Sequence, residues 1–313
     1  MDVLASVAKR VKRLSTLLRR RYSSIRHLVP YGLVKVYQKY QNRIADLRQY
    51  YIPVEEKSQL RNIYHCCVWK TGSQWLLSIL SDVKVYQASG LLHFHPSRIG
   101  KSMEDKATTE RYYHDAFPSG RIVGPLCVDV DRFNDIEKNT PYRVFFVTRN
   151  PRDLVVSWYY SAKKTHIVKA DENNKLVETR QKLRNSSKEM GLVHSIDHLC
   201  EYDTFKCMKS WASKAHNPNV HVVKFENLYG NGSVQTFRNL FEFLDIQMSK
   251  TDLMELLEAY SFERLSGRQR SNENTESHLR GGSEGEWKSH FTPVVEDYFN
   301  KKVGREIADL LGY

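Results

Sequence analysis

Residues 63–80 constrain the fold of this chain more than any other stretch. The apolar run 63–68 has the length of a buried strand, and apolar positions recur at helical spacing from residue 75 onward. Between them, Gly72 permits a close backbone approach and Lys70 adds a positive charge. A strand, a tight turn and a helix start present free N–H groups and the positive end of the helix dipole. The stretch therefore predicts an anion site.

The stretch is not a Walker A loop, the signature of P-loop kinases. That motif places its lysine after the second of two glycines, whereas here Lys70 precedes the single Gly72. Taken alone, the stretch is compatible with a phosphate or sulfate site. It is also compatible with an ordinary strand-to-helix turn that carries an exposed lysine.

Two later stretches favour the anion site. Residues 144–149 are predicted as a second buried strand ending at Arg149, and Pro151 suits the first turn of the helix that follows. Arg149 at the strand tip and Ser157 two turns into that helix can converge on one anion. Residues 280–288 form a glycine-rich segment with an arginine at its entrance.

Together these stretches resemble the sulfotransferases that use 3′-phosphoadenosine 5′-phosphosulfate (PAPS), especially the cytosolic small-molecule type. The family's Pro-Lys-Ser-Gly-Thr-Thr-Trp motif stands here as residues 69–75, its Arg-Asn-Pro-Lys-Asp…Ser motif as 149–157, and its Arg-Lys-Gly-x-x-Gly-Asp-Trp-Lys motif as 280–288. The motifs occur in the family's order. The resemblance implies an α/β fold, a single domain with a central parallel β-sheet flanked by helices, related to P-loop kinases.

The resemblance also implies a donor site for PAPS, with its desulfonated form (PAP) as product and no metal. Lys70 would stabilise the charge that grows on the departing phosphate. Arg149, Ser157 and Arg280 would hold the 3′-phosphate, because the arginine fork matches phosphate oxygens. The expected cofactor-binding residues are Lys70, Thr71, Gly72, Ser73, Gln74, Trp75, Arg149, Ser157, Phe225, Phe262, Arg280, Gly281 and Gly282.

The chain departs from the family at the general base. The family carries Lys-Thr-His near the end of the strand expected over residues 121–129, and by register Gly124-Pro125-Leu126 stands there. Asp129, just beyond, is the candidate base, and His93 and His95 compete with it. We expect a sulfotransferase that acts on a hydroxyl or nitrogen of a small-molecule acceptor, such as a secondary metabolite. The alternative is a protein of the same fold that binds PAPS or PAP without efficient transfer.

The net charge of +12 lies mostly at the N-terminus. Residues 1–50 hold twelve Lys/Arg against two Asp, and residues 2–22 place apolar side chains at steps of three and four, as in a basic amphipathic helix. We expect a basic helical extension over residues 1–53 and a sulfotransferase domain over 54–313. The helix could pack on the body or a partner subunit, contact a membrane surface, or act as a transit peptide. Nucleic-acid binding is the least favoured role.

Neither a transmembrane span nor a secretory signal is expected from the sequence. It has no run of about 18 apolar residues and no apolar region typical of a secretory signal. The five cysteines are odd in number and match no zinc pattern, which favours a reduced cytoplasmic protein. The oligomeric state stays open, with a homodimer as one option.

Three further segments carry expectations of secondary structure. Residues 83–86 are predicted as a short strand and residues 91–96 as a loop. Residues 163–200 are charged and polar, and are predicted as an excursion over a substrate pocket or a solvated helix pair.

Overall fold

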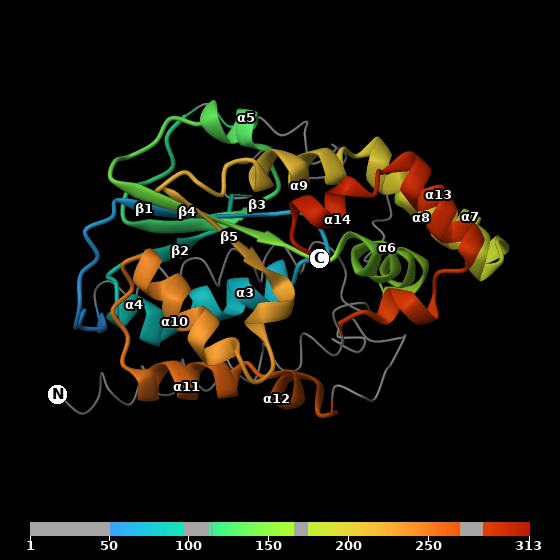
Figure 1. Ribbon diagram of the computed structural model, residues 1–313. Helices are drawn as coiled ribbons and strands as arrows, with labels where there is room; N and C mark the ends of the chain where they lie inside the picture. The colour runs from blue at the N-terminus through green and yellow to red at the C-terminus, as the bar shows by residue number, and fades with distance from the viewer. Residues whose placement is uncertain (1–50, 97–112, 114, 166–174, 270–283) are drawn as a thin grey trace.

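A five-stranded parallel sheet, in the order β2-β3-β1-β4-β5, forms the centre of the protein (Figure 1). The computed structural model describes residues 51–96, 113, 115–165, 175–269 and 284–313. Helices cover both faces of the sheet. The predicted fold class is therefore confirmed. The predicted extension over residues 1–53 lies almost entirely outside the described residues.

The elements alternate along the chain as an α/β fold requires. The strands are β1 (Asn62–Cys67), β2 (Leu92–Phe94), β3 (Arg121–Leu126), β4 (Tyr142–Thr148) and β5 (Val220–Lys224). The helices are α3 (Ser73–Leu80), α4 (Val83–Gln87), α5 (Val130–Asn134), α6 (Pro151–Tyr160), η4 (Ser161–Thr165), α7 (Lys175–Asn185), α8 (Lys188–Glu201), α9 (Thr204–Ala212), η5 (Phe225–Leu228), α10 (Ser233–Phe243), α11 (Lys250–Ala259), α12 (Phe262–Ser266), η6 (Glu286–Ser289), α13 (Pro293–Lys302) and α14 (Glu306–Leu310).

Strand β1 feeds two separate cores because successive side chains of a strand point to opposite faces. Tyr64 and Cys66 join the core formed with α5, α6, α8, α9, α13 and α14. Ile63 and Cys67 join the core formed with α3, α4, α10 and α11. All four side chains are fully buried. Burial on both faces explains why residues 63–68 read as a continuous apolar run rather than as an alternating one.

The carboxyl ends of β1 and β4 are neighbours, and the chain leaves them toward opposite faces. After β1 it enters α3 in one core, and after β4 it enters α6 in the other. In parallel sheets a ligand crevice forms at such a switch point, outside the carboxyl ends of the strands. Lys70 and Arg149 both lie at this edge.

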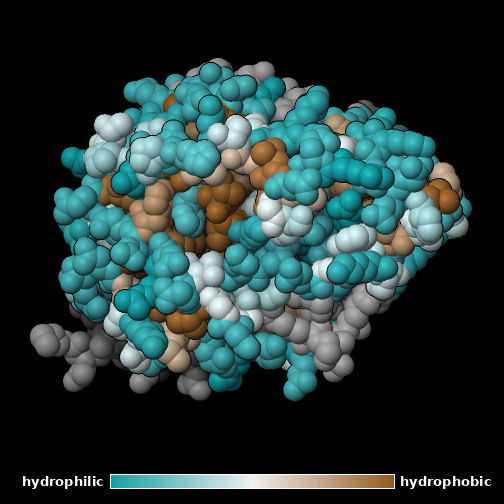
Figure 2. All heavy atoms as spheres, viewed as in Figure 1, coloured by the Kyte–Doolittle hydropathy of each residue, from teal (hydrophilic) through white to brown (hydrophobic). Residues whose placement is uncertain are grey.

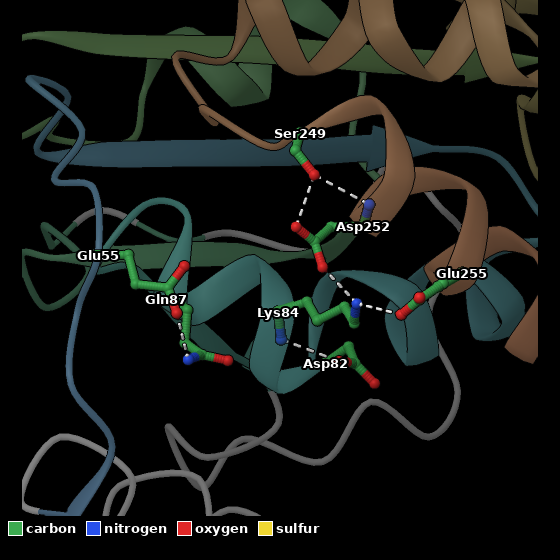
Figure 3. Close-up of polar contacts among 7 residues, drawn as sticks. All are labelled: Glu55, Asp82, Lys84, Gln87, Ser249, Asp252 and Glu255. Atoms are coloured by element: carbon green, nitrogen blue, oxygen red, sulfur yellow. Dashed lines mark hydrogen bonds and ion pairs between the residues drawn. The ribbon is translucent and has the colours of Figure 1, made fainter.

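The prediction of a strand at residues 83–86 was wrong, because residues Val83–Gln87 form helix α4. Asp82 caps the helix by accepting a hydrogen bond from the backbone N–H of Lys84. The Lys84 ammonium also bonds Asp252 and Glu255 of α11, which joins the two helices (Figure 3). Local capping and this contact outweigh the strand preference of two valines.

The loop predicted at residues 91–96 was also wrong in part, because Leu92–Phe94 pairs with β3 as an edge strand. The strand expected over residues 121–129 ends at Leu126 as β3, and its pairing with β1 is interrupted. The pairing of β1 with β3 shifts register, so that Tyr64 faces Val123 while Cys66 faces Leu126. The extra residue lies at Gly124-Pro125, and Gly124 packs so closely on His65 that a Cβ would stand 2.7 Å from the His65 Cβ.

The described part of residues 163–200 is not an excursion, because η4, α7 and α8 belong to the body of the domain. Helix α8 packs against α6 at Gly191, where a Cβ would stand 2.5 Å from the Tyr159 ring. Leu192, Ile196 and Leu199 are buried. Residues 166–174 lie outside the described residues.

The other edge of the sheet is β5, whose Val220 and Val222 are only partly buried. Figure 2 shows a largely hydrophilic surface on which hydrophobic side chains gather in the middle of the view, over the region where Figure 1 draws β5. In the part of the chain that the structure describes, no helix is long and apolar enough to cross a membrane.

Candidate functional site

The loops after β1 and β4 meet through a direct hydrogen bond. Nη1 of Arg149 donates to the carbonyl oxygen of Lys70 at 2.9 Å, and Arg149 is buried. Lys70 has a φ of +67°, in the left-handed region that non-glycine residues seldom adopt, and Gly72 has a φ of +72°. The sequence predicted that these two loops converge, and the structure brings them together.

An aromatic group covers the turn. The Phe225 ring, at the end of β5, lies against Gly72 and beneath the Arg149 guanidinium, whose central carbon is 5.1 Å from the ring centroid. The Trp75 ring meets Phe225 edge-on at 6.4 Å between centroids. Three residues predicted from the family motifs, Gly72, Trp75 and Phe225, therefore lie in one cluster with Arg149.

The three polar residues of the turn differ in what their side chains can do. The Thr71 hydroxyl is buried and donates to the carbonyl oxygen of Val68 at 2.7 Å, so it fixes the turn. Its backbone N–H, rather than this hydroxyl, is the group that Thr71 can offer to a ligand. Ser73 begins α3 and is partly exposed, and Gln74 is exposed.

Trp75 also anchors the segment that precedes Phe262. Its Nε1–H donates to the carbonyl oxygen of Tyr260 at 2.8 Å, and the Tyr260 hydroxyl donates to Asp82 at 2.8 Å. Phe262 itself is buried, with the Arg268 guanidinium 5.7 Å from its ring. The bridge from Lys84 to α11 holds the helix that leads into this segment (Figure 3).

Helix α6 is fixed at its start by a buried carboxylate. Glu226 accepts a hydrogen bond from the backbone N–H of Asn150 at 2.8 Å and another from the Tyr313 hydroxyl at 2.6 Å. Burial, followed by the neighbouring Glu226 charge, raises the pKa of the Tyr313 phenol, so this hydroxyl stays protonated and donates. Ser157 lies on α6 and is partly exposed.

Arg280, Gly281 and Gly282 lie outside the described residues, but the chain that directly follows them is held on α6. Asp153, which is 1% exposed, accepts hydrogen bonds from the backbone N–H groups of Gly285 and Trp287, each at 2.8 Å. The neighbouring Arg152 guanidinium lies 4.9 Å from the Trp287 ring. The end of the glycine-rich segment is thus fastened two residues from Pro151, at the same edge as Arg149.

Asp129, the predicted candidate base, has a clear structural task. Its carboxylate accepts the backbone N–H of Arg132 at 2.9 Å and lies 3.9 Å from the Arg132 Nε, so it caps helix α5. Leu126, in the place of the family histidine, is fully buried. His93 is buried in β2, next to β3.

Sequence reasoning missed Asp153 and Glu226, which hold this edge together. It also missed His198 and Tyr202 of the α8 segment, whose rings lie near the ring of Trp69, the residue before Lys70. Asp153 lies in the first turn of the helix predicted after Arg149. Its partners Gly285 and Trp287 are 132 and 134 residues away, and no spacing in the sequence links them to it. Nor does any spacing place α8 beside the donor loop. Within the described residues, no group of three or more His, Cys, Asp or Glu is arranged to hold a metal ion.

A family model described as "Sulfotransferase domain" matches residues 65–310. The chain belongs to the sulfotransferase family. The match confirms the predicted family, the PAPS-dependent sulfotransferases, and the predicted enzyme class. It falls inside the domain expected over residues 54–313.

Named relatives of this sulfotransferase are distant. Human sulfotransferase 2A1 is 22% identical over 264 residues, which are 77% of this chain and 82% of the relative. Rat sulfotransferase 2A6 is 24% identical over 176 residues, 53% of this chain, so the match spans little more than half (57%) of that relative's length. A crystal structure of mouse sulfotransferase SULT7A1 complexed with PAP has a TM-score of 0.50 at 14% identity, covering 81% of this chain and 89% of that one. That likeness supports the fold.

Proposed function

We propose that this sulfotransferase moves a sulfonate group from PAPS to a hydroxyl or nitrogen of a small-molecule acceptor, with PAP as the product. The observation that carries the proposal is the hydrogen bond from Arg149 to the Lys70 carbonyl. This bond joins the motif at residues 69–75, predicted to bind the 5′ end of the nucleotide, to the motif at residues 149–157, predicted to bind its 3′-phosphate. Both motifs therefore lie at one edge of the sheet. A secondary metabolite is the acceptor class that we favour.

The residues present fit a phosphorylated nucleotide. Nε of Arg149 is buried and has no hydrogen-bond partner within the described residues, so one N–H of a positive group lacks an acceptor. A phosphate oxygen would satisfy it. Arg149 would hold the 3′-phosphate together with Ser157 and Arg280. The flat rings of Phe225, Trp75 and Phe262 would line the adenine side.

PAPS supplies a sulfonate that is already activated by its bond to phosphate. The turn after β1 would stabilise the charge left on that phosphate. Lys70 brings an ammonium group, and residues 71–73 bring backbone N–H groups at the start of α3. The left-handed backbone of Lys70 and Gly72 shapes this turn before any ligand arrives.

A second candidate function is binding of PAPS or PAP without efficient transfer. Gly124, Pro125 and Leu126 carry no ionisable side chain where the family has a lysine and a histidine, and Leu126 is fully buried. Incubation with ³⁵S-labelled PAPS and a pooled set of phenols, alcohols and amines separates the two. Label transferred to an acceptor supports the enzyme. Binding of PAP with no transfer to any acceptor favours the second candidate.

We also propose that residues 1–53 are a separate helical extension that contacts a second subunit or a membrane surface. If the extension contacts a second subunit, the protein is a homodimer. We further propose that the protein acts in the cytoplasm. The five cysteines, all free thiols, are in keeping with a reducing compartment. Deleting residues 1–53 should spare transfer. It should abolish dimers in sedimentation if the extension contacts a subunit, or vesicle binding if it contacts a membrane.

A further inference from the structure

A group of stacked rings lies directly beside Lys70. Trp69 precedes Lys70 in the chain, and its ring stacks on Trp158 with centroids 5.2 Å apart and an interplanar angle of 16°. His198 of α8 stacks on the same Trp158 at 4.7 Å and lies 6.3 Å from Trp69. Tyr202 completes the group. Its ring centroid lies 4.4 Å from that of His198 and 5.3 Å from that of Trp69.

The place of this ring group follows from the chain on both sides of the donor site. Trp69 adjoins Lys70, and Trp158 adjoins Ser157, so the two tryptophans flank two of the residues proposed to hold the donor. Helix α8 packs on α6, and His198 of α8 stacks on Trp158 of α6. The His198 ring is therefore near Trp69, which adjoins Lys70, and stacks on Trp158, which adjoins Ser157.

The chemistry of the reaction calls for a base at such a position. An acceptor hydroxyl must lose its proton as it attacks, and imidazole is the side chain best matched to that task near neutral pH. His198 and Trp69 are both partly exposed, whereas His65 is fully buried. The Asp129 carboxylate is engaged in capping α5.

We propose that His198 is the general base of this sulfotransferase, and the inference rests on the proposed function. As the acceptor oxygen forms its bond to sulfur, the bond between sulfur and the bridging phosphate oxygen breaks, and its electron pair stays with that oxygen. His198 takes the acceptor's hydroxyl proton through an imidazole nitrogen and later releases it to water. Trp69 and Tyr202 provide flat walls for the acceptor, which favours an aromatic hydroxyl compound, a phenol.

The test compares His198→Gln with His194→Gln, a matched change one turn earlier on α8. The probe acceptor is 2-naphthol. We expect His198→Gln to lower kcat/KM by about 10²–10⁴-fold and to abolish the acidic limb of its pH profile. PAP affinity, measured by calorimetry, should stay within about twofold of the wild-type value in both variants. His194→Gln should keep the rate and the limb.

Three results would overturn the inference. The first is an unchanged pH profile in His198→Gln. The second is a parallel loss of PAP affinity and rate, which would indicate a structural role. The third is loss of the limb in Asp129→Asn instead. If the wild type binds PAP but transfers to no acceptor, the proposed function fails separately. The place of the acceptor is then tested by labelling His198 with diethyl pyrocarbonate in the presence and absence of 2-naphthol. We expect 2-naphthol to slow the labelling. An unchanged labelling rate would contradict the inference.

Discussion

The ring of Phe225 occupies the space that a side chain on Gly72 would need, since a Cβ there would stand 2.4 Å from the ring's Cε2. Gly72 is also left-handed. Gly72→Ala should therefore strain the turn and displace the ring that covers it. We expect PAP to bind at least about tenfold more weakly and the free energy of unfolding to fall by about 1–3 kcal/mol. Calorimetry and urea denaturation measure the two effects.

Gly120→Ala is the matched control for that substitution. Gly120 has a φ of +75°, nearly the same as Gly72, but a Cβ there would meet no atom within 4 Å. This variant should lose about 1–2 kcal/mol of stability from backbone strain alone and keep its affinity for PAP. Equal PAP affinity in both variants would contradict the role given to the contact between Gly72 and Phe225.

Replacing Arg149 by lysine should weaken PAP binding although the charge is kept. Lysine cannot donate to the Lys70 carbonyl and to a phosphate through one planar fork. We expect the Kd for PAP to rise by about 10–100-fold, equivalent to about 1.4–2.7 kcal/mol. Arg143→Lys, in the strand that precedes Arg149 but bonded to Asn219, should leave the Kd unchanged. A Kd equally insensitive to both changes would argue against a phosphate site at Arg149.

Asp153→Asn should loosen the segment that follows Arg280. The carboxylate accepts two backbone N–H groups, whereas an amide offers one oxygen and an NH₂ group that cannot accept. We expect faster hydrogen exchange at the amides of Gly285 and Trp287, a stability loss of about 1–3 kcal/mol and weaker PAP binding. Asp297→Asn, at an exposed ion pair with Lys301, should change none of these. Unchanged exchange at residues 285 and 287 would count against the fastening role.

Stability should fall with acid because of His65. Full burial against Phe145 lowers the pKa of this imidazole from its ordinary 6.5 to about 3. Below pH 6.5 the unfolded chain takes up a proton that the folded chain does not, until the pH reaches about 3. The contribution of neutral His65 is therefore complete above pH 6.5, and decreases at lower pH by up to about 1.4 kcal/mol per pH unit.

Urea unfolding of the wild type and of His65→Leu at pH 7.5, 6 and 5 checks this expectation. As the pH is lowered, the unfolding free energy of the wild type should fall more than that of His65→Leu. A pH-independent difference would show that another group controls the acid sensitivity.

The convergence of Lys70 and Arg149 could be predicted because it depends on local rules. Parallel strands place their carboxyl ends at one edge, and each residue directly follows a buried strand. The cap formed by Asp129 was equally readable, since an aspartate three residues ahead of its N–H donor is a common helix start. Asp129 was predicted only as a base, although capping of α5 is the simpler role.

The position of His198 could not be predicted in the same way. Its neighbours Trp69 and Trp158 come from other segments, and they meet it only because α8 packs closely on α6 at Gly191. Such contacts depend on tertiary packing that periodicity does not encode. The strand predicted at residues 83–86 failed for a related reason, since the Lys84 contacts on α11 come from 168 and 171 residues away.

The bond from Tyr313 to Glu226 has a practical consequence for handling the protein. The phenol of Tyr313 shares one carboxylate with the backbone of Asn150, so an alteration at residue 313 would be felt where α6 begins. A handle or label attached at Tyr313 would therefore disturb ligand affinity. Handles and fluorescent labels are better attached elsewhere, and assays on trimmed protein should first confirm that this tyrosine is retained.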